Sequence, residues 1–117
     1  MDLILWRHAQ AEAGEPDEGR ELTQQGRKQA ARMGAWLDRV LPSGCKILCS
    51  PTSRTIQTVE ALGRKYKIVP EIGPMASATE VLHAVGWPDS KISVMVVGHQ
   101  PWLGEVASLL LTGEQQE

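Results

Sequence analysis

The chain has 117 residues, of which 42% are hydrophobic and 22% charged, and its formal net charge at pH 7 is −2. This length favours one domain, residues 1–117, with one hydrophobic core. The small acidic balance argues against nucleic acid or an anionic membrane as the main partner. No apolar run approaches the roughly 20 residues that span a bilayer, and the start lacks the features of a signal peptide. We therefore expect a cytoplasmic protein.

Apolar runs alternate with helical patterns along the chain. The predicted strands cover residues 3–6, 46–49, 68–69 and 92–97, and the predicted helices about 24–41, 52–65, 77–86 and 102–111. Thr23 can cap the first helix, whose apolar stripe comprises Ala30, Met33, Leu37, Val40 and Leu41. The segment 9–21, rich in Glu, Gly and Pro, is typical of an exposed loop. Strands alternating with helices predict an α/β fold, a three-layer α/β/α sandwich with a mainly parallel sheet.

Two cysteines, at positions 45 and 49, lie four residues apart in a segment typical of a strand. At about 3.3 Å per residue their Cα atoms would be roughly 13 Å apart, too far for a disulfide. A zinc site would need further ligands nearby, and the surrounding sequence has none. We expect two buried thiols and no metal.

Polar residues directly follow three predicted strands. Arg7 and His8 follow the first, Ser50 and Arg54 the second, and His99 the last. The carboxyl ends of parallel strands meet at one edge of a sheet, where open α/β folds bind ligands. Guanidinium groups suit phosphate oxygens, a neutral histidine can attack phosphorus, and helix starts near 51–53 and 101 would add N–H groups. The sequence therefore predicts a phosphoryl-transfer site.

Each of these residues also has a simpler interpretation. A single arginine after a strand is usually a solvated charge, and a single histidine near a turn is usually a cap. Their joint placement at one sheet edge favours a site. His83, inside a predicted helix and without a matching partner, is interpreted as structural.

Four motifs carry a family resemblance. They are Arg-His at 7–8 after the first strand, Leu-Thr-Gln-Gln-Gly at 22–26, Ser-Pro-x-x-Arg-x-x-Gln-Thr at 50–58 and Val-Val-Gly-His at 96–99. In order and spacing, over about residues 1–110, they resemble the histidine phosphatase (phosphoglycerate-mutase-like) superfamily. The short length, the compact stretch between Arg54 and His99, and Gln100-Pro101 after that histidine resemble the SixA-type phosphohistidine phosphatases.

The resemblance implies a phosphoglycerate-mutase-like fold and a two-step reaction without a cofactor. His8 would attack phosphorus to form a phosphohistidine enzyme, which water then hydrolyses. Arg7, Arg54 and His99 would hold the phosphoryl oxygens, and Ser50 would help to bind phosphate. The implied partner is a phosphohistidine-bearing protein, such as a phosphotransfer domain or carrier.

Two departures from the family pattern matter. Ala9 stands where the family usually has Gly, and Pro74 stands where many members carry the Glu that protonates the leaving group. Glu71 and Glu80 are nearby in the sequence, but neither matches the motif. An alcohol leaves poorly unless an acid protonates it. Imidazole, with a pKa of about 6.5, leaves easily near neutral pH, so the departure favours a phosphohistidine substrate.

Two alternatives stay open from the sequence. One is a phosphatase of the same superfamily that acts on a small phosphorylated molecule, such as a sugar phosphate. The other is a non-catalytic phosphate-binding module, against which the retained Arg7, His8, Arg54 and His99 argue. SixA-type chains usually continue past the helix after His99 into further strands. The resemblance therefore implies either a truncated chain or a short member of the family.

Overall fold

The computed structural model describes residues 3–86 and 91–112. Its strands are β1 (Leu3–Arg7), β2 (Lys46–Cys49), β3 (Lys67–Ile68) and β4 (Val94–Gly98). They form one parallel sheet in the order β1-β4-β2-β3. Its helices are α1 (Gln24–Val40), α2 (Ser53–Glu60), α3 (Ala78–Val85) and α4 (Trp102–Thr112), with short 3₁₀ helices η1 (Asp17–Gly19) and η2 (Pro70–Ile72).

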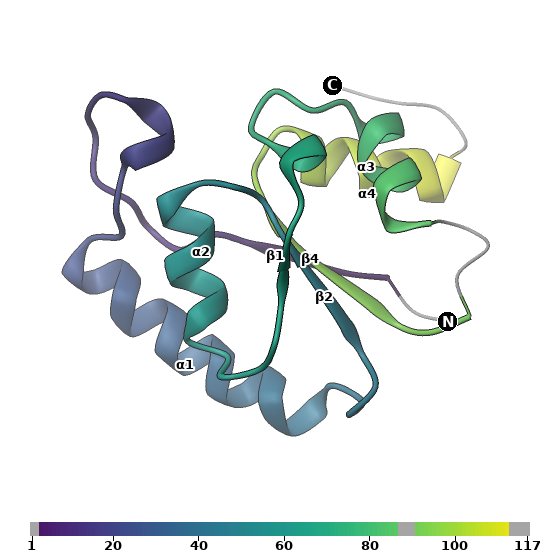
Figure 1. Ribbon diagram of the computed structural model, residues 1–117, viewed down its shortest axis with the longest axis horizontal. Helices are drawn as coiled ribbons and strands as arrows, with labels where there is room; N and C mark the ends of the chain where they lie inside the picture. The colour runs from purple at the N-terminus through teal and green to yellow at the C-terminus, as the bar shows by residue number, and fades with distance from the viewer. Residues whose placement is uncertain (1–2, 87–90, 113–117) are drawn as a thin grey trace.

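The sheet is the middle of three layers. Figure 1 shows α1 and α2 on one face and α3 and α4 on the other. The three-layer α/β/α prediction is therefore confirmed. Within the described ranges, no helix is long and apolar enough to cross a membrane.

Alternate residues of the central strands supply two separate cores. Ile47 and Cys49 belong to the cluster beneath α1 and α2, whereas Leu48 between them belongs to the cluster beneath α3 and α4. β4 alternates in the same way and is buried throughout. Because both faces are packed, a slip of one residue would exchange the two cores, so burial sets the strand register.

The register brings three strand ends to one level. Arg7 pairs with Gly98, and Cys49 pairs with Val97. Beyond the strands, the His8 N–H donates to the Gly98 carbonyl at 3.1 Å and the Ser50 N–H donates to the Val97 carbonyl at 3.0 Å. The residues that follow β1, β2 and β4 therefore lie together, as the sequence predicted.

The face that α1 buries differs from the predicted stripe. Met33 and Val40 are 44% and 53% exposed, whereas Gly34, outside the stripe, is buried. A Cβ at Gly34 would overlap the Ala61 carbonyl beyond the end of α2. The missing side chain lets the two segments approach closely, so Gly34 lies on the buried face of α1 while Met33 and Val40 lie outside it.

Several element boundaries also differ. α2 ends earlier than predicted, since the chain turns through Ala61 to Gly63, which has a φ of 77°. β4 begins two residues later than predicted, and β3 lies one residue earlier. The loop 9–21 contains η1 and a bridge between Ala11 and Leu22. Thr23 caps α1 as predicted, its hydroxyl accepting from the Gly26 N–H. Cys49 is buried as predicted, whereas the prediction was wrong for Cys45, which is half-buried just before β2; neither forms a disulfide.

Candidate active site

His8 is held in one tautomer by the backbone next to it. Its Nδ1 lies 2.7 Å from the Ala9 carbonyl oxygen. A carbonyl only accepts hydrogen bonds, so Nδ1 carries the proton and Nε2 keeps its lone pair. The Ala9 N–H donates to Thr58 Oγ1 at 3.0 Å, and that hydroxyl donates to the Arg54 carbonyl at 2.7 Å. α2 thereby fixes the backbone beside His8. Among the described residues only glycines have a positive φ, so an alanine fits at position 9.

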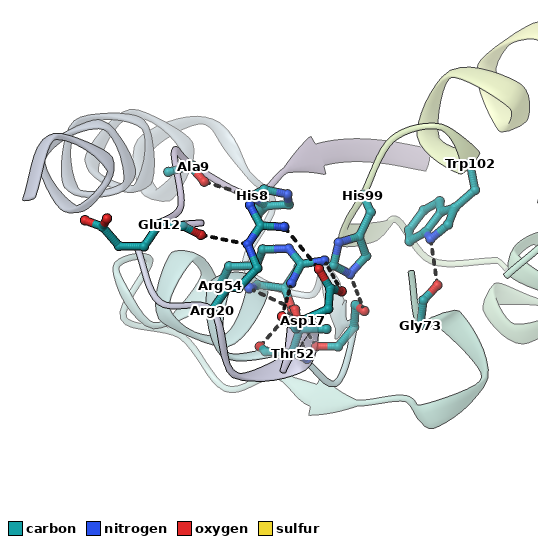
Figure 2. Close-up of polar contacts among 12 residues, drawn as sticks. His8, Ala9, Glu12, Asp17, Arg20, Thr52, Arg54, Gly73, His99 and Trp102 are labelled. Atoms are coloured by element: carbon teal, nitrogen blue, oxygen red, sulfur yellow. Dashed lines mark hydrogen bonds and ion pairs between the residues drawn. The ribbon is translucent and has the colours of Figure 1, made fainter. Parts of the chain in front are cut away.

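His99 follows β4 and is 2% exposed. Its Nε2 lies 2.6 Å from Ser50 Oγ, and its Nδ1 is buried without a partner among the described residues. Its ring meets that of Trp102 edge-on at 6.2 Å, and lies 5.4 Å from the His8 ring between centroids. The Trp102 indole N–H is anchored on the Gly73 carbonyl at 2.9 Å (Figure 2). Ser50, predicted to bind phosphate, is fully buried, and its hydroxyl contacts His99.

Arg54 is the second residue of α2 and is 4% exposed. Its Nη1 donates to the Asp17 carbonyl at 2.7 Å, and its Nη2 to Asp17 Oδ2 at 3.0 Å. Its Nε is buried without a partner in the described part of the chain. Figure 2 shows Arg54 in the same cluster of side chains as His8 and His99, and its charge acts on both histidines. Arg54 Nε and His99 Nδ1 are thus two buried polar atoms without a partner among the described residues.

A cavity of about 430 Å³ opens beside His8. Its lining consists of Arg7, His8, Ala9, Gln10, Ala11, Arg20 and Gln29. Arg7 is exposed and His8 is half-buried. The cavity is therefore open to solvent on the side where Arg7 and Arg20 supply positive charge.

Both site histidines are neutral near pH 7. Burial lowers the pKa of His8 from its usual 6.5. The hydrogen bond to the Ala9 carbonyl raises this pKa, and the positive charges of Arg54, Arg7 and Arg20 lower it again, so that the net shift is downward. Burial, followed by the charge of Arg54, lowers the pKa of His99 to about 3. His8 thus keeps the lone pair that a nucleophile needs.

Two residues at this site escaped the sequence interpretation. Asp17 and Arg20 lie in the segment taken as an exposed loop. Arg20 Nη1 donates to Asp17 Oδ1 at 3.1 Å, and its Nε donates to the Glu12 carbonyl at 2.7 Å. Hydrogen bonds from Arg20 and Arg54 lower the pKa of Asp17. The sequence signal that could have revealed them is an acidic and a basic residue three positions apart, shortly before the Leu-Thr motif.

Neither of the two glutamates near the missing acid in the sequence lies at His8. Glu71 and Glu80 line a different cavity together with His83, and Glu80 accepts from the Ser77 N–H at 3.0 Å in the cap of α3. None of the described residues that line the His8 cavity is acidic. Across residues 3–86 and 91–112, no three His, Cys, Asp or Glu side chains are grouped to hold a metal ion.

Comparison with known proteins identifies the family. A model of the histidine phosphatase superfamily (branch 1) matches residues 3–80. The sequence is 31% identical over 126 residues to the phosphohistidine phosphatase SixA homolog of Haemophilus influenzae, covering 94% of this chain and 77% of that protein. The chain therefore belongs to the histidine phosphatase superfamily, which makes it a phosphatase.

Solved structures of histidine phosphatases share the fold of this chain. The protein histidine phosphatase SixA complexed with tungstate matches with a TM-score of 0.84 and 26% sequence identity, over 100% of this chain and 81% of that one. The phosphoserine phosphatase from Entamoeba histolytica, solved with 3-phosphoglyceric acid, matches with a TM-score of 0.72 at 16% identity, over 97% and 80% of the two chains. The second likeness shows the shared fold alone. Within the superfamily, the chain is similar to SixA phosphohistidine phosphatases.

Proposed function

We propose that this phosphatase removes the phosphoryl group from phosphohistidine in a partner protein, with His8 as the nucleophile. The observation that carries the proposal is the state of His8. Its Nδ1–H is hydrogen-bonded to the Ala9 carbonyl. The cavity that His8 lines together with Arg7 and Arg20 has no acidic residue in its described lining.

In the first step, His8 Nε2 attacks phosphorus. The bond between phosphorus and the substrate's imidazole nitrogen breaks, and its electron pair stays on that nitrogen. If the other nitrogen of the substrate ring is protonated, imidazole leaves neutral, so the enzyme need not supply a proton. The expulsion of an alkoxide would require an acid. The acid-free lining thus supports a phosphohistidine substrate over an alkyl phosphate.

In the second step, water attacks phosphorus and the bond to His8 Nε2 breaks. The proton stays on His8 Nδ1, hydrogen-bonded to the Ala9 carbonyl, throughout, so the ring departs as a neutral imidazole. Inorganic phosphate is released, and the proton lost by water passes to solvent. The same hydrogen bond therefore favours both the attack by His8 and its later release.

Three cationic or donor groups are assigned to the phosphoryl oxygens. Buried polar groups without partners are rare in native proteins, and Arg54 Nε and His99 Nδ1 are two such groups. Phosphoryl oxygens would satisfy both, and Arg7 would add charge from the exposed side. Negative charge that develops on these oxygens is stabilised by donors already in place.

Ser50 acts through His99 in this scheme. For His99 Nδ1 to donate to a phosphoryl oxygen, it must carry the ring proton. Nε2 then accepts from the Ser50 hydroxyl at 2.6 Å. Ser50 is thus assigned to hold the tautomer of His99 and not to contact phosphate.

The test compares the wild type with His8→Ala and, as a matched control, His83→Ala on the exposed side of α3. Each protein is given a phosphotransfer domain phosphorylated on histidine, and separately an alkyl phosphate. We expect phosphate release from the phosphohistidine protein and a labelled, acid-labile phosphoenzyme in the wild type and the control. His8→Ala should lose both by at least about a thousandfold, because removal of a nucleophile stops the covalent step.

Two results would contradict the proposal. Phosphoenzyme that forms equally in His8→Ala would remove His8 from the reaction. A strong preference for the alkyl phosphate would show that the protein substrate is wrong.

A further inference from the structure

We infer that Asp17 is the positioning residue for Arg54, holding one edge of its guanidinium so that the other edge meets the phosphoryl group. The inference rests on the proposed function and adds to it a residue outside the four family motifs. Asp17 belongs to η1, and Arg54 to α2, 37 positions later in the chain.

The Arg54 guanidinium has one edge bound to Asp17 and another without a partner among the described residues. Asp17 accepts from Nη1 through its backbone carbonyl and from Nη2 through Oδ2. An arginine has five N–H donors in a planar fork. The Nε–H, which is buried without a partner among the described residues, remains, together with one hydrogen on each Nη. The Nε–H and the hydrogen of the Nη on the same side point the same way, so this edge can form a bidentate pair with two oxygens of a phosphoryl group.

Asp17 is itself held in place by Arg20. Arg20 Nη1 binds Oδ1, the carboxylate oxygen that Arg54 does not use, while Arg20 Nε is tied to the Glu12 carbonyl. The backbone of η1 closes on itself, with the Gly19 N–H donating to the Pro16 carbonyl at 3.1 Å. The carboxylate thus joins two arginines of one site and fixes the angle of each.

The contacts argue against two other roles for Asp17. A proton donor would need a carboxyl that is protonated near neutral pH, whereas hydrogen bonds from Arg20 and Arg54 lower the pKa of Asp17. A competitor that occupies the phosphate position would have to leave when substrate binds. The backbone carbonyl of Asp17 also binds Arg54, and Arg54 Nε has no partner among the described residues that a phosphoryl group would have to displace.

The chain contains a matched control for this pair. Arg64 binds Asp38 in the same manner, with Nε 2.8 Å from Oδ1 and Nη2 2.9 Å from the Asp38 carbonyl. The two aspartate side chains are similarly exposed, at 46% and 56%. Asp38 lies in α1, outside the set of residues that contact His8, Arg54 or His99. A purely structural effect of losing such a carboxylate should therefore appear in both.

The experiment measures tungstate binding, kcat and KM in the wild type, Asp17→Ala, Asp17→Asn and Asp38→Ala. We expect Asp17→Ala to bind tungstate about 10-fold more weakly and to lose about 10- to 100-fold in kcat/KM, because a misplaced binding group acts on the transition state. Asp17→Asn keeps an oxygen that can accept from Arg54, so its tungstate affinity and kcat/KM should lie between those of the wild type and Asp17→Ala. Asp38→Ala should match the wild type in binding and kcat/KM, with a melting temperature close to that of Asp17→Ala.

The outcomes distinguish a wrong role for Asp17 from a wrong function for the protein. In the first case the wild type binds tungstate and forms the phosphoenzyme, but Asp17→Ala and Asp17→Asn bind tungstate and turn over substrate equally well. The positioning role proposed for Asp17 is then wrong. Tighter tungstate binding in Asp17→Ala would mean that the carboxylate competes with phosphate, which also overturns the inference. If the wild type itself forms no phosphoenzyme, the proposed function fails first.

Discussion

Replacing Ser50 with alanine removes the hydroxyl that lies 2.6 Å from His99 Nε2. Both residues are almost fully buried, so water does not take the place of the lost group. The His99 ring would then have two buried nitrogens without partners where the native protein has one. The substitution also frees the ring to place its proton on either nitrogen.

The expected size of the effect follows from this geometry. Leaving a buried polar atom unsatisfied costs about 1–3 kcal/mol. In a domain of this size, each kcal/mol lowers the melting temperature by roughly 4–8 °C. Removal of a whole oxyanion donor costs about 100- to 1,000-fold in kcat. Ser50→Ala keeps His99 and disturbs only its tautomer, so we expect a smaller loss, about 10-fold in kcat with little change in KM.

Thermal unfolding and steady-state kinetics with a phosphohistidine protein test this prediction. Ser93→Ala is the control, because Ser93 is half-buried just before β4, at the opposite end of the sheet. Its backbone carbonyl accepts from the Lys46 N–H at 2.9 Å, a bond that the substitution leaves intact. A Ser50→Ala protein that melts and turns over like the Ser93→Ala protein would refute the role assigned to the hydrogen bond.

Two further predictions concern stability. The folded pKa of His99, about 3, lies below its unfolded value of about 6.5, so its contribution is complete above pH 6.5 and is lost as pH falls toward 3. The wild type should lose about 2 kcal/mol more than His99→Gln between pH 7 and 5 in urea titrations, with exposed His83→Gln as control; equal losses in wild type and His99→Gln would contradict this. A Cβ at Gly98 would overlap the Trp102 ring, whereas one at Gly44 meets nothing within 4 Å. Gly98→Ala should therefore cost about 1–3 kcal/mol and Gly44→Ala almost nothing by thermal unfolding, and equal melting of the two proteins would disprove the overlap.

The sequence alone was sufficient for the architecture and for the main members of the site. Strand and helix periodicities are local properties, because they follow from which side chains each element buries. Parallel strands also place their carboxyl ends at one edge whatever the details of packing. The convergence of His8, Arg54 and His99 could therefore be predicted from three sharp transitions between apolar and polar residues.

Contacts between distant residues were decided only by the tertiary structure. Gly34 belongs to the buried face of α1 because it packs against Ala61. The hydrophobic pattern of α1 alone does not indicate this contact. The pairing of Asp17 with Arg54 joins a loop to a helix. Local composition shows that such a loop is polar, but not which buried arginine its carboxylate will meet.

The same reason applies to the chemistry of the two histidines. Their identities were visible in the sequence, but their protonation depends on burial and on single hydrogen bonds. The Ala9 carbonyl fixes the His8 tautomer, and Ser50, 49 residues away, reaches His99 Nε2. Residue type determines what a side chain can do. The folded surroundings determine which nitrogen is available to do it, because desolvation and hydrogen bonding act over a few ångströms of space and not along the chain.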